Sequence, residues 1–284
     1  MWQYVYRFIF YTIIRTFRYV LDAFNRTINY LRISVTDKCN LRCVYCMPTE
    51  GVPLLRHEDL LSFEEIADFT RIAVRMGITK VRLTGGEPLV RRGIITLVEM
   101  LPTISGIQDF AMTTNGILLA DYAPELAKAG LHRVNVSLDA LEPARYAEIT
   151  RGGDVKKVLA GIDAARAAGL LPIKINCVIQ ESPEEPDARA VTQFCQSEGL
   201  VVRFIKRMDL AGGHFSVVIG ETGGDCAHCN RLRLTSNGLV RPCLFNDLGF
   251  PVRELGAEAA IRQAVAAKPE CGSASGAMFH TIGG

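Results

Sequence analysis

Residues 30–46 read YLRISVTDKCNLRCVYC, a short β-rich run followed at once by three cysteines within eight residues. The run YLRISV predicts a β-strand because it is rich in β-branched and aromatic residues. The cysteines follow with the spacing C-x3-C-x2-C, as Cys39, Cys43 and Cys46. Disulfides need pairs and a structural zinc site needs four ligands. A loop with three thiols therefore predicts a metal site that leaves one coordination position open.

This strand is the first of six β-rich runs that alternate with helical stretches. The predicted strands are 30–35, 80–84, 109–114, 133–139, 173–179 and 201–206, and the predicted helices are 62–76, 91–101, 122–129, 143–149, 154–168 and 186–199. Ser62 and Glu65 form a capping box at the start of the first helix. Such repeats predict parallel strands with right-handed crossovers. We expect an α/β fold with a partial (βα)6 TIM-like barrel, and a doubly wound sheet is the main alternative.

The chain divides into three predicted parts. Residues 1–29 form an aromatic and basic extension, residues 30–207 form the barrel, and residues 208–284 form a small C-terminal region that ends in Gly-Gly. Arginines interrupt the extension too often for a membrane span, and its charges lack the order of a signal peptide. We expect a packing or disordered extension there, with an interfacial amphipathic helix as the alternative.

The amino-acid composition indicates the class of protein and the cellular compartment. The 284 residues are 49% hydrophobic and 22% charged, which is typical of a soluble globular protein. A net charge of only +2 predicts no nucleic-acid partner. Nine cysteines without a secretory signal favour a reducing compartment, the cytoplasm. The three cysteines scattered outside any cluster, Cys177, Cys195 and Cys271, are expected to be buried or neutral thiols.

The unusual motifs follow the predicted strands. The loop 39–46 follows the first strand, GGEP (85–88) the second, TTNG (113–116) the third and SLDA (137–140) the fourth, and Met208 follows the sixth. In parallel α/β proteins, chemistry gathers at the carboxyl ends of the strands. We therefore expect one site at one end of the sheet.

A second group of cysteines lies in the C-terminal part, with the spacing C-x2-C-x13-C. Its members are Cys226, Cys229 and Cys243, and His228 lies inside the first pair. Thiolate sulfur selects zinc, copper(I) or iron–sulfur clusters. A zinc ribbon completed by a histidine is one interpretation, and a second iron–sulfur cluster with an open iron facing the substrate is the other.

Basic residues occur within the predicted strands, where burial of an unpaired cation costs several kcal/mol. They are Arg32, Lys80, Arg82, Lys174 and Arg203. Salt bridges to acids of the protein would explain them, but the strands themselves are poor in Asp and Glu. Several converging cations suit a polyphosphate, so we expect an external anion. Arg231 and Arg233 add positive charge beside the second cysteine group.

These motifs resemble the radical S-adenosylmethionine (SAM) superfamily, through the C-x3-C-x2-C loop after the first strand and GGEP after the second. A more specific resemblance is to the GTP 3′,8-cyclase family of molybdenum cofactor biosynthesis. It runs from about Tyr30 to the C-terminus, through LRISVTDKCNLRCVYCMP, VRLTGGEPLVRR, TTNG, VNVSLDAL, KINCVI, RFIKRMD, CNRLRLTSNG and a terminal GG.

The resemblance implies SAM and two 4Fe–4S clusters as cofactors, and it implies roles for individual residues. The ligands of the SAM cluster would be Cys39, Cys43 and Cys46, and those of a substrate-facing cluster Cys226, Cys229 and Cys243. Contacts with SAM would come from Tyr45, Gly86, Ser137 and Met208. Contacts with GTP would come from Arg32, Arg82, Thr113, Lys174, Arg231 and Arg233. The last two would lie near the radical path, and no general acid or base is implied. Gly283 and Gly284 match a tail that reaches into the active site.

The implied reaction is that of a radical SAM lyase. A 5′-deoxyadenosyl radical would abstract hydrogen from the ribose C3′ of GTP, and the C3′ radical would attack guanine C8 to give 3′,8-cyclo-7,8-dihydro-GTP. The implied partners are GTP, a one-electron reductant and, by pathway, cyclic pyranopterin monophosphate synthase. A homodimer stays an open alternative.

One departure from the family leaves the substrate open. Only the 17 residues 209–225 separate Met208 from Cys226, fewer than the family usually has. A related radical SAM enzyme that acts on a peptide or another small molecule is therefore the alternative. A metal-binding or scaffold protein without chemistry is a third hypothesis.

Overall fold

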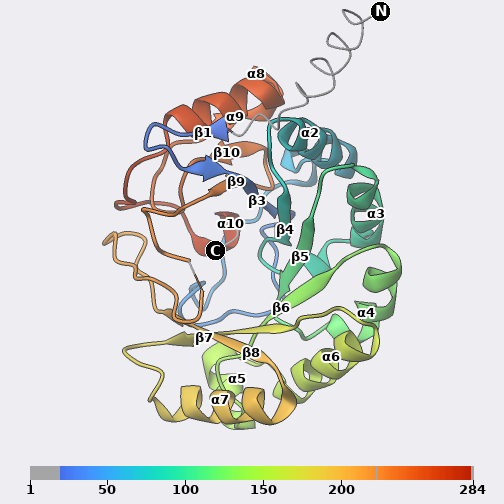
Figure 1. Cartoon of the computed structure of the whole chain (residues 1–284). Helices are drawn as coiled ribbons and strands as arrows, with labels where there is room; N and C mark the ends of the chain where they lie inside the picture. The colour runs from blue at the N-terminus through green and yellow to red at the C-terminus, as the bar shows by residue number, and fades with distance from the viewer. Residues whose placement is uncertain (1–19, 222, 283–284) are drawn as a thin grey trace, which may run out of the picture.

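The computed structural model describes residues 20–221 and 223–282. Figure 1 shows a curved sheet with helices along its outer side. Of the predicted extension 1–29, residues 1–19 lie outside the described residues. Residues 20–29 form a small antiparallel hairpin of β1 (Val20–Leu21) and β2 (Thr27–Ile28).

The main sheet has nine strands in the order β11-β10-β9-β3-β4-β5-β6-β7-β8. Its parallel part is β3 (Tyr30–Ser34), β4 (Lys80–Thr84), β5 (Asp109–Thr114), β6 (Arg133–Ser137), β7 (Lys174–Ile179) and β8 (Val201–Lys206). These strands follow one another in sequence order, whereas a doubly wound sheet reverses its order at a switch point. The predicted parallel α/β fold is confirmed. On its other side β3 pairs with β9 rather than with β8, so the described strands form an open arrangement.

Six helices connect the parallel strands and lie on the outer side of the sheet. They are α2 (Phe63–Arg75), α3 (Ile94–Met100), α4 (Leu119–Lys128), α5 (Pro143–Thr150), α6 (Val155–Ala167) and α7 (Pro186–Glu198). Short 3₁₀ turns span His57–Asp59, Pro88–Val90 and Leu101–Thr103. The predicted capping box of Ser62 and Glu65 is present at the start of α2. No helix in the described part of the chain is long and apolar enough to cross a bilayer.

The C-terminal region continues the same sheet. Strand β9 (Arg231–Leu234) lies parallel to β3, and β10 (Leu239–Arg241) and β11 (Phe250–Pro251) follow antiparallel. Helices α8 (Val252–Leu255) and α9 (Ala257–Ala266) lie beside these strands, and α10 (Phe279–Ile282) lies on the inner side of the sheet (Figure 1). The second cysteine group is thereby brought beside β3.

Alternation along the strands decides which side chains reach the site. Leu31 and Ile33 of β3, and Val81 and Leu83 of β4, are at most 1% exposed and belong to the main hydrophobic core. Successive side chains of a strand point to opposite faces. Arg32 and, by the same rule, its neighbours on β4 and β9 therefore face away from this core layer, toward the inside of the curved sheet.

Candidate active site

Two adjoining cavities lie on the inner side of the sheet. The first, here the cysteine-loop cavity, is lined by the cysteines of the loop 39–46 and by the residues that follow β4, β5 and β6. The second, here the cation cavity, is lined by arginines of β3, β4, β8 and β9 and by the second cysteine group. Asn176, Ile205 and Met208 line both cavities. The two groups of cysteines thus open onto neighbouring spaces.

The glycines of GGEP fix the position of the cysteine loop. A Cβ atom on Gly85 would lie 2.6 Å from the carbonyl oxygen of Thr36, and one on Gly86 would lie 2.2 Å from that of Lys38. Any side chain at either position would collide with the backbone that leads into Cys39, so only glycine fits. The first role of GGEP is therefore to pack directly against the backbone that leads into the cysteine loop.

Glu87 ties the motif GGEP to the motif TTNG. Its carboxylate accepts hydrogen bonds from the hydroxyl of Thr114 (2.8 Å) and from the backbone N–H groups of Asn115 (2.7 Å) and Leu89 (3.1 Å). Burial raises the pKa of Glu87 to about 7, although these donors act to lower it. The Asn115 amide in turn lies 3.8 Å from the Cys39 sulfur and donates to that sulfur.

The three thiols of the loop are half-buried and lie in a desolvated setting. Burial raises the pKa of Cys43 and that of Cys46 to about 12, and Asp139 adds to the effect at Cys43. The backbone N–H of Leu41 donates to the Cys39 sulfur at 3.4 Å. Three soft donors on one tight loop, with hydrogen bonds to sulfur, fit an iron–sulfur cluster with an open iron.

Tyr45 connects the cysteine loop to SLDA. Its hydroxyl donates to Oδ2 of Asp139 at 2.5 Å, and the backbone N–H of Val178 donates to Oδ1 at 2.7 Å. Burial raises the pKa of Asp139 to about 6, against the lowering effect of these two donors. The loop after β3, the motif SLDA at the end of β6 and strand β7 are thus joined through one carboxylate.

The four residues predicted to contact SAM, Tyr45, Gly86, Ser137 and Met208, all line the cysteine-loop cavity. Thr113, predicted for GTP, lines this cavity as well and not the cation cavity. Its hydroxyl is buried and has no hydrogen-bond partner among the described residues. The structure therefore groups Thr113 with the residues predicted for the cofactor.

The cation cavity contains a row of three arginines. In the parallel register Arg32 of β3 lies opposite Arg82 of β4 on one side and opposite Arg233 of β9 on the other. All three point into the cavity. Like charges placed directly opposite one another destabilise a sheet. This row therefore favours an anion in front of it.

Burial and mutual repulsion lower the pKa values of the three arginines in the row. Burial lowers the pKa of Arg32 and of Arg82, and the neighbouring guanidinium groups lower both further. Burial and Arg231 lower the pKa of Arg233 to about 10, although the nearby Cys243 opposes the shift. Arginine keeps its proton in proteins, so an anion that binds here would gain charge-assisted hydrogen bonds.

Lys174 and Arg203, also predicted to meet an external anion, have an internal partner. The carboxylate of Glu221 lies 2.5 Å from the Lys174 ammonium and 3.3 Å from the Arg203 guanidinium. Glu221 and Arg203 line the cation cavity, whereas Lys174 is not among its lining residues. Lys80, which was grouped with these cations, is exposed at the start of β4 and lines neither cavity. The prediction that Lys80 lies with the other cations at one site was wrong. Alternation along a strand predicts which face a side chain points to, but not how far along the strand it lies from the site.

Glu221 belongs to the shortened segment 209–225. Within its described residues this segment contains no helix and no named strand, and it packs along the edge of β8. Phe204 and Ile219 exchange two backbone hydrogen bonds, at 3.1 and 3.0 Å. The segment crosses the inner side between β8 and the second cysteine group and so brings a carboxylate to the cations.

The second cysteine group lines the cation cavity, as Cys226, Cys229 and Cys243. Burial acts to raise the pKa of Cys229, but the ammonium of Lys268 and the backbone N–H and charge of Arg231 outweigh it, so this pKa is lowered. His228, the histidine of the zinc-ribbon interpretation, is 77% exposed on its side chain and bonds Asp225 at 2.7 Å. Among the described residues no three His, Cys, Asp or Glu side chains converge on a single metal ion.

Several site residues carried no sequence signal. Tyr30 has the guanidinium carbons of Arg82 and Arg231 at 5.4 and 5.5 Å from its ring centre, and its buried hydroxyl makes no hydrogen bond within the described residues. Lys268 and Glu221 are charged residues that belong to none of the motifs. Asn176, at the border of the two cavities, lies in the run KINCVI, where no role was assigned to it.

The C-terminal segment reaches the site. Phe279 of α10 lines the cysteine-loop cavity, and the carbonyl oxygen of Ile282 accepts a hydrogen bond from Arg233 at 3.3 Å. Gly283 and Gly284, which were predicted to enter the active site, lie outside the described residues. Residues 279–282 thus contact the lining of both cavities.

The fold and the cysteine loop define a radical SAM enzyme. The family model of the Radical SAM superfamily matches residues 33–189, which include the loop, GGEP, TTNG and SLDA. The solved structures of Streptococcus suis SuiB (TM-score 0.58, 16% identity, 87% of this chain and 68% of that chain) and of anSMEcpe with bound AdoMet and Kp18Cys peptide (0.57, 15%, 85% and 81%) share this fold. At these identities the likeness concerns the fold alone.

Curated relatives define the family more narrowly. The GTP 3′,8-cyclase of Thermodesulfovibrio yellowstonii is 40% identical over 82% of this chain and 87% of its own length, and that of Moorella thermoacetica is 43% identical over 80% and 84%. The chain belongs to the GTP 3′,8-cyclase family. The first match extends over 280 positions but covers only 82% of this chain, so the relative contributes residues that this chain lacks.

Proposed function

We propose that this chain cyclises GTP to 3′,8-cyclo-7,8-dihydro-GTP, the first step of molybdenum cofactor biosynthesis, and is a radical SAM lyase. The observation that carries the proposal is the row of Arg82, Arg32 and Arg233 in a cavity that adjoins the three-cysteine loop. A nucleoside triphosphate brings the negative charge that such a row favours. GTP is also the substrate in the names of the relatives.

The charge of the cation cavity supports a polyphosphate substrate. Six basic side chains line it, against the two acids Glu221 and Asp225. The Nε atoms of Arg82 and Arg203 are buried and make no hydrogen bond among the described residues. Buried donors without a partner are costly, so a ligand that accepts from them is stabilised. We assign GTP contacts to Arg32, Arg82, Lys174, Arg231 and Arg233, and keep Thr113 as a contact near the border with SAM.

SAM and two 4Fe–4S clusters are the cofactors of this chain. We assign the SAM cluster to Cys39, Cys43 and Cys46, and the second cluster to Cys226, Cys229 and Cys243. When bound, the first cluster and SAM supply the 5′-deoxyadenosyl radical that takes hydrogen from the ribose C3′ of GTP. The chemistry belongs to the cofactor, and the protein supplies position, charge and exclusion of water.

The border of the two cavities is where cofactor and substrate would meet. Asn176, Ile205 and Met208 line both spaces. Tyr45 and Ser137 would hold SAM on one side, while the arginine row would hold the triphosphate on the other. Hydrogen abstraction requires the two molecules in contact, so we place the ribose of GTP at this border.

A peptide substrate is the alternative, and it explains fewer features of the cation cavity. The likeness to SuiB and anSMEcpe concerns the fold, and a peptide needs no row of buried arginines. The cations favour the nucleotide over the peptide.

The remaining partners are part of the same proposal. A one-electron reductant must feed the clusters, and the cyclised nucleotide would pass to cyclic pyranopterin monophosphate synthase. We propose no nucleic-acid partner and keep a homodimer as an open alternative. Thiolate clusters require a reducing milieu, which favours the cytoplasm.

Anaerobic turnover of the reconstituted protein tests the proposal. With SAM, reductant and GTP, we expect 5′-deoxyadenosine together with a new nucleotide that is an isomer of GTP. With ATP in place of GTP, both should drop to the background of uncoupled SAM cleavage. Equal 5′-deoxyadenosine with and without GTP, and no new nucleotide, would contradict the proposal.

A further inference from the structure

A buried lysine ties two arms of the second cysteine group together. Lys268 is only 3% exposed as a residue, and its ammonium donates to the carbonyl oxygens of Arg231 (2.8 Å) and Pro242 (2.6 Å). Pro242 directly precedes Cys243, and Arg231 follows Cys229 by two positions. One ammonium therefore fixes the backbones that carry these two cysteines relative to each other.

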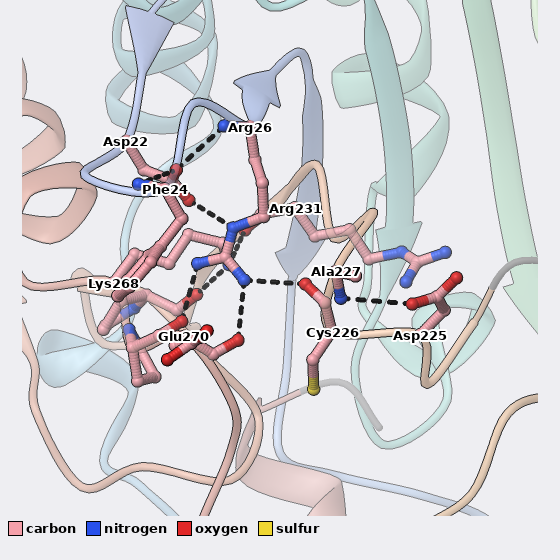
Figure 2. A network of polar contacts seen from close by, with 11 residues as sticks. Asp22, Phe24, Arg26, Asp225, Cys226, Ala227, Arg231, Lys268 and Glu270 are labelled. Atoms are coloured by element: carbon pink, nitrogen blue, oxygen red, sulfur yellow. Dashed lines mark hydrogen bonds and ion pairs between the residues drawn. The ribbon is translucent and has the colours of Figure 1, made fainter.

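A buried ion pair holds the third arm (Figure 2). The guanidinium of Arg26 donates to the carbonyl oxygens of Cys226 (2.7 Å), Pro269 (2.6 Å) and Glu270 (2.8 Å). Its Nε donates to Asp22 at 2.6 Å, and the side chains of Arg26 and Asp22 are 6% and 0% exposed. Loss of one partner of such a pair is strongly destabilising, because it leaves a buried charge uncompensated. The pair therefore anchors Cys226 to residues 269–270, which directly follow the buried lysine.

The two cations differ in what compensates their charge. Arg26 has the carboxylate of Asp22 and is not among the residues that line the cation cavity. Lys268 lines this cavity, and within the part of the chain that the structure describes it forms no ion pair with an acid. Besides the two carbonyl oxygens, its ammonium donates to the sulfur of Cys229. A buried ammonium without an anionic partner is costly. A negatively charged cluster on the Cys229 thiolate would supply the missing partner.

The charge of Lys268 acts on Cys229. Burial acts to raise the pKa of this thiol, but the charge and hydrogen bond of Lys268, with those of Arg231, outweigh it, whereas burial raises the pKa of Cys226 to about 11. Positive charge and hydrogen bonds at a sulfur ligand raise the reduction potential of an iron–sulfur cluster, because they stabilise the added electron. A triphosphate in the same cavity acts in the opposite direction, and Lys268 offsets it at the ligand itself.

We propose that Lys268 is a positioning residue of the second cluster and sets its reduction potential, by holding Cys229 and Cys243 in place and by stabilising the electron that the cluster takes up. The step is a one-electron reduction. The electron comes from the one-electron reductant of the proposed function and stays on the cluster, while no bond breaks and no proton moves. The inference rests on the cluster assignment made under the proposed function, to Cys226, Cys229 and Cys243, and does not depend on which nucleotide binds.

A redox titration of the second cluster is the first test. It uses the full-length chain with Cys39→Ala, Cys43→Ala and Cys46→Ala, in which only the second cluster loads, and follows the reduced cluster by electron paramagnetic resonance. Lys268→Gln replaces the ammonium by a neutral amide that still donates hydrogen bonds. A unit charge about 4 Å away changes an equilibrium by more than tenfold even at an effective dielectric constant of about 20. At a fixed potential we expect the ratio of reduced to oxidised cluster to fall at least about tenfold, a shift of about 59 mV for one electron.

Two further variants provide the comparison. Lys268→Arg keeps the charge and should retain the potential of the triple-alanine parent. Lys128→Gln removes the same charge from the exposed end of α4 and should leave the potential unchanged. An unchanged potential in Lys268→Gln at full iron content would overturn the proposal for Lys268 alone. A parent that loads no cluster would contradict the cluster assignment under the proposed function, and the inference with it, so the two failures are distinguishable.

Pulsed electron paramagnetic resonance of the same parent is the second test, and its main result needs no variant at Lys268. The parent is labelled with ¹⁵N in its lysine side chains and reduced with dithionite. A hydrogen bond from Lys268 to the Cys229 sulfur places a ¹⁵N nucleus next to the electron spin. We therefore expect a ¹⁵N hyperfine coupling in the parent and its loss in Lys268→Arg. A parent spectrum without this coupling, or a coupling that survives in Lys268→Arg, would refute the proposal.

Discussion

The carboxylate of Glu221 lies 2.5 Å from the ammonium of Lys174, and the same carboxylate lies 3.3 Å from the guanidinium of Arg203. An acid from the shortened segment 209–225 thus forms ion pairs with two cations that were predicted to bind the substrate. These contacts hold the pKa of Glu221 below its usual range, against the opposing effect of burial, so it is ionised at neutral pH. A triphosphate that binds in the cation cavity must compete with this carboxylate.

Removal of that charge is therefore expected to tighten GTP binding. Glu221→Gln keeps the shape of the side chain and ends the competition, and we expect Kd for GTP to fall about three- to tenfold, as for a partly exposed ion pair. Calorimetric titration of GTP into the reconstituted protein measures the change. Glu184→Gln, an exposed acid before α7, is the matched control. Weaker binding in Glu221→Gln would mean that Glu221 helps to bind the nucleotide.

The arginine row is expected to dominate affinity for GTP. Arg82→Ala removes a buried cation from one end of the row and should raise Kd at least about thirtyfold, since a buried charge pair contributes 2 kcal/mol or more. Lys80→Ala, on the same strand but exposed, should leave Kd unchanged. The comparison is made by titration and by the GTP dependence of 5′-deoxyadenosine formation. Equal effects of the two variants would contradict the claim that GTP binds in the cation cavity.

Glu87 predicts an unusual dependence of stability on pH. Its folded pKa of about 7 lies above the ordinary value of 4.5, so the folded chain keeps a proton that the unfolded chain has lost between these values. The contribution is fully present below pH 4.5 and is lost as the pH rises through 7. Between pH 5 and 8 the free energy of unfolding should fall by about 2.5 kcal/mol more than in Glu87→Gln.

Urea denaturation of the cluster-free protein at a series of pH values checks this expectation. The variant lacks the titrating group and provides the baseline for all other carboxyls. Parallel pH profiles of the two proteins would show that Glu87 is ionised throughout.

The Arg26–Asp22 pair is expected to stabilise the fold and to position the second cluster. Arg26→Ala leaves Asp22 buried without its partner, and breaking a buried pair costs about 3–5 kcal/mol. Arg253→Ala, whose pair with Glu65 is exposed, should cost at most about 1 kcal/mol. Urea denaturation measures the cost, and iron content after reconstitution shows whether the second cluster still loads. A full complement of iron in Arg26→Ala at unchanged stability would contradict the role given to this pair.

Local patterns in the sequence predicted the six parallel strands well. The boundaries of the six parallel strands differ from the predicted ones by no more than two residues, because β-rich runs bounded by glycines and caps carry a local signal. The placement of β9 beside β3 carried no such signal. Parallel pairing between residues about 200 positions apart depends on the packing of the whole chain, and propensity describes single segments.

The site was predictable where motifs are contiguous and not where single residues meet. Tyr45 and Gly86 follow strands, Ser137 ends one, and all three were expected at one edge of the sheet. Glu221, Lys268 and Arg26 stand alone in the sequence, and only the fold brings each of them to a cavity or a cluster. Their roles come from contacts over long sequence distances, which a motif does not record.

Deuterium transfer from the substrate tests the central claim most directly. Full-length protein with reconstituted clusters is incubated anaerobically with SAM, reductant and GTP that carries deuterium at C3′, and 5′-deoxyadenosine is analysed by mass spectrometry. If the chain abstracts hydrogen from the ribose of GTP, the 5′-deoxyadenosine gains one deuterium and a cyclised isomer of GTP accompanies it. Unlabelled 5′-deoxyadenosine, formed at the same rate with and without GTP, would contradict the account.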